Sequence, residues 1–189
     1  MGGTGQFKHF QRWDVPCVTI SVPDLLDELH TNDDLWLADQ SRQRKIKVQQ
    51  HTQSIFLRGA LRVPGGPSLS DDIQESAPTR FASRFPATMQ LLNRVAAHFN
   101  AELCRALYVR LLPFSQVLPH VDGGAYYLIR NRYHLVLYSV DGSIMSCEDE
   151  QVVMYPGELW GFDNKLRHES RNASPEWRVH LIFDLLPKG

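Results

Sequence analysis

The chain has 189 residues, of which 43% are hydrophobic and 22% charged, and its formal net charge is -1. These values are ordinary for a globular protein of one domain, and we treat residues 1–189 as that domain. Because the charge is nearly balanced, nothing favours nucleic acid as a partner. We find neither a membrane span nor a signal peptide, and the three cysteines suggest neither a disulfide framework nor a zinc ribbon, so we expect a cytoplasmic protein.

Two helices are predicted in the first half of the chain. Pro23 precedes the acidic stretch Asp24–Leu29, a pattern typical of a helix start. A longer helix is predicted from Phe85 to about Asn100, because apolar residues recur there at spacings of three and four: Met89, Leu92, Ala96 and Phe99. Between the helices, residues 54–58 have the pattern of a strand, and residues 63–78 are predicted to form an irregular loop rich in turn formers.

From about Leu107 the chain alternates apolar and polar residues in short runs, which is typical of β-strands. The strand candidates are residues 107–112, 132–138, 151–155, 158–162 and 177–186, with turns at Gly123-Gly124, Asp141-Gly142 and Pro156-Gly157. Short strands with regular turns favour a sandwich or barrel, and a jelly roll is the natural candidate. We therefore predict a mostly β protein with flanking helices, in which residues 1–105 form a mixed α/β part packed on a barrel of residues 106–189.

Candidate metal ligands occur in the sequence Pro119-His120-Val121-Asp122. Residues i and i+2 of an extended segment point to the same side, so His120 and Asp122 can bind one ion together. A HxD pair is common by chance and is weak evidence alone. With His168 as a third ligand, however, the set matches the triad of two histidines and one carboxylate that holds iron(II) and leaves adjacent positions open. Zinc more often receives three nitrogen or sulfur ligands.

Two strand candidates combine cationic and apolar residues. In Trp177–Phe183, Arg178 and His180 are expected on one face of the strand and apolar residues on the other. A buried Arg178 needs an anion, because an unpaired buried charge is costly, and a dicarboxylate ligand would supply one. Arg132 and His134 lie two residues apart on one face in the same way. Alone, such a pair is more often a solvated strand edge; beside the triad and Arg178 it suggests a second cationic contact.

Taken together, these segments resemble the aspartyl/asparaginyl β-hydroxylase family over roughly residues 106–186, in both order and spacing. The matching segments are Leu118–Asp122, Asn131–Leu137, Pro156–Asn164, His168 and Arg178–Asp184. The resemblance implies a double-stranded β-helix, a cupin-like fold, with iron(II), O₂ and the co-substrate 2-oxoglutarate. It also implies residue roles: His120, Asp122 and His168 as metal ligands, Arg178 as the partner of the distal carboxylate of 2-oxoglutarate, and Arg132 and His134 near its iron-chelating carboxylate.

The resemblance implies a dioxygenase that hydroxylates an unactivated carbon of its substrate. Peptide-modifying members of the family can lack the metal carboxylate, so the presence of Asp122 favours a small molecule such as an amino acid. The same carboxylate favours hydroxylation over halogenation. Residues considered for substrate contacts are Arg110, Tyr126, Tyr127 and Arg130, with packing or solvation as the alternative for each. Where some relatives have a serine near the co-substrate, this chain has Val109 or Arg110.

Three alternatives stay open at this stage. The protein can be a hydroxylase of aspartyl or asparaginyl residues in a peptide or protein. It can also be a cupin-type metal enzyme that does not use 2-oxoglutarate, which would account for the triad but not for Arg178. The third is a binding domain that kept the fold and lost turnover, and the intact set of ligands argues against it.

Overall fold

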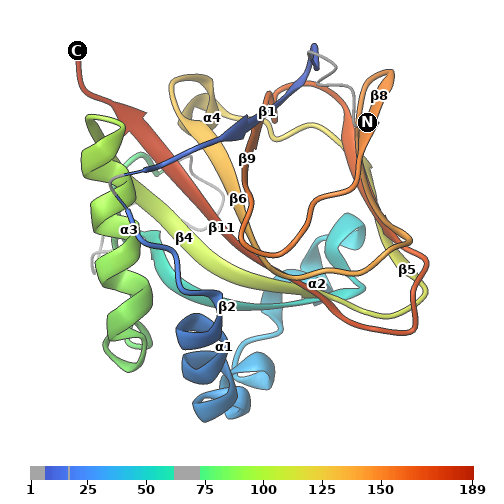
Figure 1. Ribbon diagram of the computed structural model, residues 1–189, viewed down its shortest axis with the longest axis horizontal. Coiled ribbons are helices and arrows are strands. Elements are labelled where there is room, and N and C mark those ends of the chain that lie inside the picture. Colours follow the sequence, from blue (N-terminus) through green and yellow to red (C-terminus); the bar gives the residue numbers. More distant parts are fainter. Residues whose placement is uncertain (1–6, 17, 62–72) are drawn as a thin grey trace.

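The fold consists of a major and a minor antiparallel sheet (Figure 1). The computed structural model describes residues 7–16, 18–61 and 73–189. The strand order in the major sheet is β1 (Phe10–Trp13), β9 (Leu159–Phe162), β6 (Asn131–Tyr138), β11 (Arg178–Pro187), β4 (Ala101–Leu111), β2 (Thr52–Ala60) and β3 (Ser76–Pro78). The order in the minor sheet is β5 (Ser115–His120), β10 (His168–Asn172), β7 (Ser143–Cys147) and β8 (Glu150–Val152). Most neighbouring strands are distant in sequence, so the site they form is non-local.

Helices α1 (Val22–Thr31) and α3 (Pro86–His98) cover one face of the major sheet (Figure 1). Ser21 caps α1, because its Oγ accepts a hydrogen bond from the Asp24 N–H at 3.4 Å, and proline occupies the first turn of both helices. Both predicted helices are thus confirmed. The side chains of α3 that pack most deeply are Thr88, Leu91, Leu92, Val95 and Ala96, with Met89 and Phe99 partly buried beside them.

The face of the major sheet that lies under the helices holds the main hydrophobic core. Leu181 and Phe183 of β11 belong to it, as do Leu135 of β6 and Ile55 of β2. These side chains are 0 to 2% exposed, so the helices are held to the sheet mainly by apolar burial. Alternation along each strand leaves the remaining side chains on the opposite face.

That opposite face turns towards the minor sheet, and we call it the cavity face. It includes Val109 of β4, Arg132, His134 and Val136 of β6, and Arg178, His180, Ile182 and Asp184 of β11, which the strand register places side by side. A second apolar cluster closes part of the space between the sheets, where Val136 and Trp160 pack with Met145 and Cys147. The rest is a cavity, and half of the residues that line it have ionisable side chains.

Most predicted strands are confirmed, although their first and last residues differ from the prediction. Several other strands were not predicted. The strand predicted at residues 151–155 is only β8, and β4 begins six residues earlier than expected because Ala101–Ala106 pairs with the end of β11. The sequence analysis does not predict β1, β5, β7 or β10. These strands are short, and β10 has the polar sequence His168–Asn172, so pairing with neighbours, not apolar alternation, makes them extended.

The first half of the chain contributes strands as well as helices. Strands β1, β2 and β3 hydrogen-bond into the major sheet, in addition to the packing predicted for this half. Residues 76–78 were expected in a loop and instead form β3; residues 62–72 of that loop lie outside the described residues. The short helices are η1 (Asp33–Leu37), α2 (Ser41–Lys45), η2 (Lys47–Gln49), η3 (Ala82–Arg84) and α4 (Ala125–Leu128).

Two of the cysteines, Cys104 and Cys147, are buried and free, whereas Cys17 lies outside the described residues. Within the described part of the chain, no helix has the length and apolar character needed to cross a bilayer. Neither the free cysteines nor the absence of such a helix from the described residues bears on the site between the two sheets.

Candidate metal centre

The three predicted metal ligands come together at one end of the minor sheet. In the register of β5 and β10, His120 lies directly opposite His168, and the centroids of their rings are 4.3 Å apart. Asp122 follows β5 by two residues and is held in place by its backbone N–H, which donates to the Asn164 carbonyl at 3.0 Å. One ligand atom from each of the three residues lies within 4.8 Å of the other two, which is close enough for a shared ion.

Both histidines use the same ring nitrogen, Nδ1, to contact a backbone carbonyl. Nδ1 of His120 lies 2.8 Å from the Leu118 carbonyl, and Nδ1 of His168 lies 2.9 Å from the Leu166 carbonyl. Because a carbonyl oxygen only accepts, Nδ1 donates its hydrogen in both rings and Nε2 keeps a lone pair for a metal. Burial also lowers the pKa of His168, which keeps this ring neutral and able to bind.

Asp122 has one oxygen held by the protein and the other turned to the histidines. Its Oδ2 accepts hydrogen bonds from Arg132 Nη1 at 2.7 Å and from Asn164 Nδ2 at 2.9 Å, while Oδ1 lies 3.8 Å from His120 Nε2. Burial alone would raise the pKa of Asp122, but Arg132, Asn164 and the two histidines outweigh it, so the pKa lies below its usual value. Asp122 is therefore ionised and preorganised as a monodentate ligand.

Arg132 links this ligand to the major sheet. Besides Asp122, it binds both oxygens of Asp184, with Nε to Oδ1 at 2.8 Å and Nη2 to Oδ2 at 3.0 Å. Burial alone would lower the pKa of Arg132, but Asp184, and after it Tyr127 and Asp122, raise it well above the usual value. Two carboxylates thus already neutralise Arg132. The contact of Arg132 with a co-substrate stays a prediction. Its hydrogen bond to Asp122 shows that Arg132 also holds this ligand in place.

Arg178 is buried in the same cavity without an anion of its own. It is 5% exposed, its Nε is a buried atom without a hydrogen-bond partner, and no ion pair reaches it from the described residues. Burial lowers its pKa to about 10. A guanidinium in this state is costly for the protein, and an incoming carboxylate would remove the cost while accepting two parallel hydrogen bonds.

His134 and His180 lie side by side between Arg178 and Arg132 on the cavity face. Their Nδ1 atoms are 3.2 Å apart, so one ring donates and the other accepts. Burial, and then the positive charge of Arg178, lowers the pKa of both residues well below the usual value. Both rings are therefore neutral near pH 7. His134 lines the cavity with Arg178, as its predicted role near the co-substrate requires.

Three of the four residues considered for substrate contacts, Arg110, Tyr126 and Arg130, do not line the cavity with the triad histidines. Arg110 points to the face of β4 opposite Val109 and lies between Trp36 and Trp177, with its Nε donating to Gln53. Arg130 is buried and donates to Gln74 and to the Tyr126 carbonyl. Tyr126 is fully buried, and its hydroxyl donates to Asp184 at 3.2 Å. These contacts match the packing alternative that the sequence left open for these three residues.

Tyr127 differs from these residues because it borders the metal centre. The Arg132 guanidinium lies 4.8 Å from the centroid of the Tyr127 ring, and Arg132 Nη2 donates to the Tyr127 hydroxyl at 3.4 Å. Of Val109 and Arg110, Val109 lines the cavity, and its side chain offers no hydrogen bond there. Which of the two residues corresponds to the serine of some relatives stays a prediction.

Three residues at the site have no role assigned in the sequence analysis. Asp184 continues the alternation of Arg178, His180 and Ile182 along β11, which is a signal that identifies it in retrospect. Asn164 is fully buried and holds Asp122, but its role depends on a contact across 42 residues of sequence. Arg42 lines the cavity from the short helix α2, whose sequence has no pattern pointing to a site.

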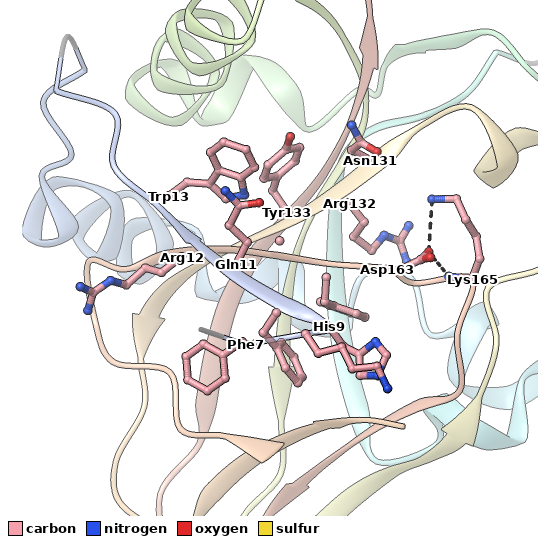
Figure 2. Close-up of a pocket in the computed structure, with 14 residues that line it drawn as sticks. Phe7, His9, Gln11, Arg12, Trp13, Asn131, Arg132, Tyr133, Asp163 and Lys165 are labelled. Carbon is pink, nitrogen blue, oxygen red and sulfur yellow. Dashed lines mark hydrogen bonds and ion pairs between the residues drawn. The ribbon is translucent and has the colours of Figure 1, made fainter. Parts of the chain in front are cut away.

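A wider hollow lies along β1, beside β9 and β6 (Figure 2). Residues 7–13 form one wall, and Asp163 and Lys165, an ion pair at 3.5 Å, lie at one end. None of the three ligands lines this hollow, whereas His120 and His168 both line the cavity between the sheets. Arg132 and Phe162 line both spaces. We therefore place the candidate site between the sheets, although the hollow along β1 is larger.

The donor set suits a first-row divalent metal. Two imidazole nitrogens with free lone pairs and one ionised carboxylate oxygen converge, which is the arrangement of a facial iron site with open positions for other ligands. The backbone carbonyls and Asn164 supply the outer contacts that such ligands require. The residues present thus fit an iron(II) ion.

Comparison with known proteins agrees with this arrangement. A family model described as aspartyl/asparaginyl β-hydroxylase matches residues 39–187. The chain is 30% identical over 116 residues to L-proline cis-4-hydroxylase of Rhizobium meliloti (strain 1021), and the match covers 59% of this chain and 40% of that protein. The chain thus spans about two fifths of the length of this curated relative.

Two solved structures have a similar fold. One is an oxidoreductase of the 2OG-Fe(II) oxygenase family from Burkholderia pseudomallei, with a TM-score of 0.55, 14% identity, and coverage of 91% of this chain and 93% of that chain. The other is a prolyl-4-hydroxylase from Pseudomonas putida, with a TM-score of 0.52, 14% identity, and coverage of 96% and 95%. At this level of identity the likeness concerns the fold. The predicted jelly roll is confirmed.

Proposed function

The chain belongs to the aspartyl/asparaginyl β-hydroxylase family, and from that premise we propose that it is an iron(II)- and 2-oxoglutarate-dependent dioxygenase. Its substrate in this proposal is a small molecule, an amino acid or an amino-acid-like compound, hydroxylated at an unactivated carbon. The resemblance to an L-proline hydroxylase supports the substrate class. Asp122 supports hydroxylation, because its carboxylate would take a place on the metal that a halide would need.

The single observation that carries the proposal is Arg178. This guanidinium is buried in the same cavity as the triad and has no counter-ion among the described residues. A metal enzyme that binds no anionic co-substrate has no use for such a group, which costs stability while it is unpaired. A dicarboxylate that reaches from the metal to Arg178 explains both the metal triad and the buried arginine without a counter-ion.

The chain's own residues have separate tasks in this reaction. His120, Asp122 and His168 hold iron, and Arg132 and Asn164 fix the ligand oxygen of Asp122. Arg178 binds the distal carboxylate of 2-oxoglutarate, and His134 borders the iron-chelating end. Iron with 2-oxoglutarate and O₂ supplies the oxidising chemistry, in which 2-oxoglutarate is converted to succinate and CO₂ and one oxygen atom enters a C–H bond of the substrate. The protein supplies the orientation of the reactants in the cavity.

The test is an aerobic screen of amino acids, nucleotides and short peptides with iron(II) and 2-oxoglutarate. The expected result is succinate release stimulated by one compound class, together with a product heavier by one oxygen atom. Asp122→Ala and His168→Ala should each abolish this turnover, because each substitution removes one of the three side chains that would hold the metal in this chain. His98→Ala is the matched control, since this histidine is exposed on α3, away from the cavity.

Co-substrate binding is measured separately under anaerobic conditions, by the absorbance band that forms when iron(II) and 2-oxoglutarate combine. Arg178→Ala should weaken 2-oxoglutarate by roughly 2 to 5 kcal/mol, as expected for a desolvated pair of charges. Full activity of Asp122→Ala would remove the triad from the proposal. An unchanged affinity of Arg178→Ala for 2-oxoglutarate would remove the co-substrate from it.

A further inference from the structure

A second arginine without a counter-ion, Arg42, reaches the cavity from outside the β-barrel. It is the second residue of α2, and it lines the same space as His120, His168 and Arg178. Its guanidinium lies 6.0 Å from the centroid of the Phe56 ring of β2, so the side chain extends over the sheet, and the residue is partly exposed. The next arginine of the helix, Arg44, is exposed. The helix therefore directs one of its two arginines inwards.

The position of Arg42 is fixed by its neighbour in the sequence. Gln43 Nε2 donates to Ser54 Oγ at 3.3 Å and to Thr52 Oγ1 at 3.5 Å. Ser54 pairs with Val109 in the strand register, so both residues lie on the cavity face. These contacts anchor α2 at the border of the cavity, and Arg42 is presented by an element that is already held to the sheet.

The carboxylates around Arg42 are occupied or out of reach. Arg132 binds both Asp122 and Asp184, and Glu169, which also lines the cavity, forms no ion pair with Arg42. Within the described residues, no hydrogen bond or ion pair reaches the Arg42 guanidinium. Burial, and then the positive charge of Arg132, lowers its pKa. An anion that enters the cavity would offset both effects.

The cavity thus has two cationic groups without anions, and the reaction brings two molecules to it. The two carboxylates of 2-oxoglutarate have partners, one at Arg178 and one at the metal. Arg42 lines the same cavity as the triad histidines His120 and His168 and as Arg132, which donates to the ligand Asp122. Arg42 therefore faces the space in which a substrate would meet the metal.

We propose that Arg42 binds the carboxylate of the substrate and makes the enzyme selective for substrates with a free carboxylate. This inference rests on the proposed function and deepens it, because it names the group by which the substrate is recognised. A bidentate arginine is suited to a planar carboxylate, and a lysine at the same place would not reproduce this geometry. A neutral compound of the same shape would leave Arg42 unpaired, so it would bind poorly.

The test uses the full chain loaded with iron(II) and 2-oxoglutarate under anaerobic conditions, where no turnover occurs. The probes are L-proline and the other free amino acids, each paired with its amide, which lacks the carboxylate. Calorimetry measures their dissociation constants for the wild type, Arg42→Gln, Arg42→Lys and the control Arg44→Gln. The absorbance band of the iron and 2-oxoglutarate complex is recorded for each variant.

We expect Arg42→Gln to weaken the preferred amino acid by roughly 30-fold or more, to leave its amide unaffected, and to leave the 2-oxoglutarate band unchanged. Arg42→Lys should recover only part of the loss, and Arg44→Gln should behave as the wild type. Equal amino-acid affinities in Arg42→Gln and the wild type would overturn the inference. So would a loss of 2-oxoglutarate binding in Arg42→Gln, which would assign Arg42 to the co-substrate.

Failure of the proposed function gives a different result from failure of the inference. A wild-type protein that binds iron but forms no band with 2-oxoglutarate would refute the dioxygenase assignment. The comparison of amino acid with amide in the iron-loaded protein would still decide whether Arg42 recognises a carboxylate.

Discussion

Arg178 is buried and Arg132 is largely buried on the cavity face, and the two arginines differ in whether carboxylates of the protein neutralise them. Arg132 has Asp122 and Asp184 within 3.0 Å, and its pKa is raised. Arg178 has no such partner among the described residues, and burial lowers its pKa to about 10. The first arginine is therefore part of the scaffold, and the second is prepared for a ligand.

This difference predicts opposite effects of one substitution on stability and on binding. Arg178→Met removes an uncompensated buried charge and keeps most of the side-chain volume. The metal-free variant should therefore unfold in urea with a free energy about 1 to 3 kcal/mol above that of the wild type. Its affinity for 2-oxoglutarate should fall by roughly 30-fold or more, because the carboxylate loses two charge-assisted hydrogen bonds.

Arg171→Met is the control, since Arg171 is exposed on β10 and its substitution should change neither quantity. A clear loss of stability in Arg178→Met would contradict the absence of a counter-ion, because only a paired arginine stabilises the empty cavity.

At the scale of the elements, the metal centre depends on the pairing of strands from both sheets. β5 and β10 of the minor sheet supply the histidines, and β6 and β11 of the major sheet supply Arg132 and Asp184. In the register, Arg132 lies directly opposite Asp184, so their ion pair joins neighbouring strands. Tyr126 of α4 donates to the same carboxylate. Asp184 thus connects two strands and a helix beneath the metal ligand.

Asp184→Asn tests this connection. The amide has the shape of the carboxylate but only one acceptor oxygen, so one Arg132 donor meets an N–H group and Asp122 alone neutralises the guanidinium. Because Asp184 is 1% exposed, we expect the free energy of unfolding to fall by about 3 to 5 kcal/mol in urea denaturation.

The control for this experiment is Asp34→Asn, which breaks the exposed ion pair between Asp34 and Arg84. Exposed pairs contribute little, so its unfolding curve should overlap that of the wild type. If Asp184→Asn unfolds like Asp34→Asn, the buried pair does not connect the strands as inferred.

In the whole molecule, the two faces of the major sheet have different chemistry. The helix face is apolar and packs on α1 and α3, while the cavity face concentrates buried histidines, arginines and aspartates. The apolar face stabilises the fold by burial, and the cavity face adds ionisable groups whose charge states differ between folded and unfolded chains. The free energy of unfolding should therefore depend on pH through the ionisable side chains of the cavity face.

The direction of this dependence follows from His134 and His180. Burial, and then Arg178, lowers both pKa values well below 6.5, so the unfolded chain binds more protons than the folded one when the pH falls below that value. Stability is thus retained above pH 6.5 and lost as the pH decreases. Each histidine that stays neutral in the fold should contribute a loss of about 1.4 kcal/mol between about pH 7.5 and about pH 5.5.

Urea denaturation of the metal-free protein at these two pH values measures the loss, which should be about 3 kcal/mol for the pair. His180→Gln should show roughly half of the dependence, while His98→Gln, which changes an exposed histidine, should retain it all. Stability that increases on acidification to pH 5.5 would show that the buried pair binds a proton in the folded state.

The sequence by itself determined the features that depend on local spacing. The HxD pair of His120 and Asp122 is an i, i+2 relation, and the alternation along β11 identifies Arg178 and His180 as one face of a strand. The two long helices follow from their apolar period and proline starts. The sequence also offered His168, 46 residues from Asp122, as the third ligand, and its short strands favoured a jelly roll, while the family resemblance implied the roles of these residues and the co-substrate.

Only the tertiary structure decided which of these residues have partners. Asn164 bonds with Asp122, Arg132 with Asp184, and Arg130 with Gln74 across 42 to 56 residues of sequence. Such contacts depend on which strands become neighbours in the two sheets, and no local pattern of residues encodes that choice. The same holds for Arg42, which a short helix without a periodic signal places beside the triad. Local spacing thus predicts which side chains share a face, and packing between distant segments determines which charges remain free to bind a ligand.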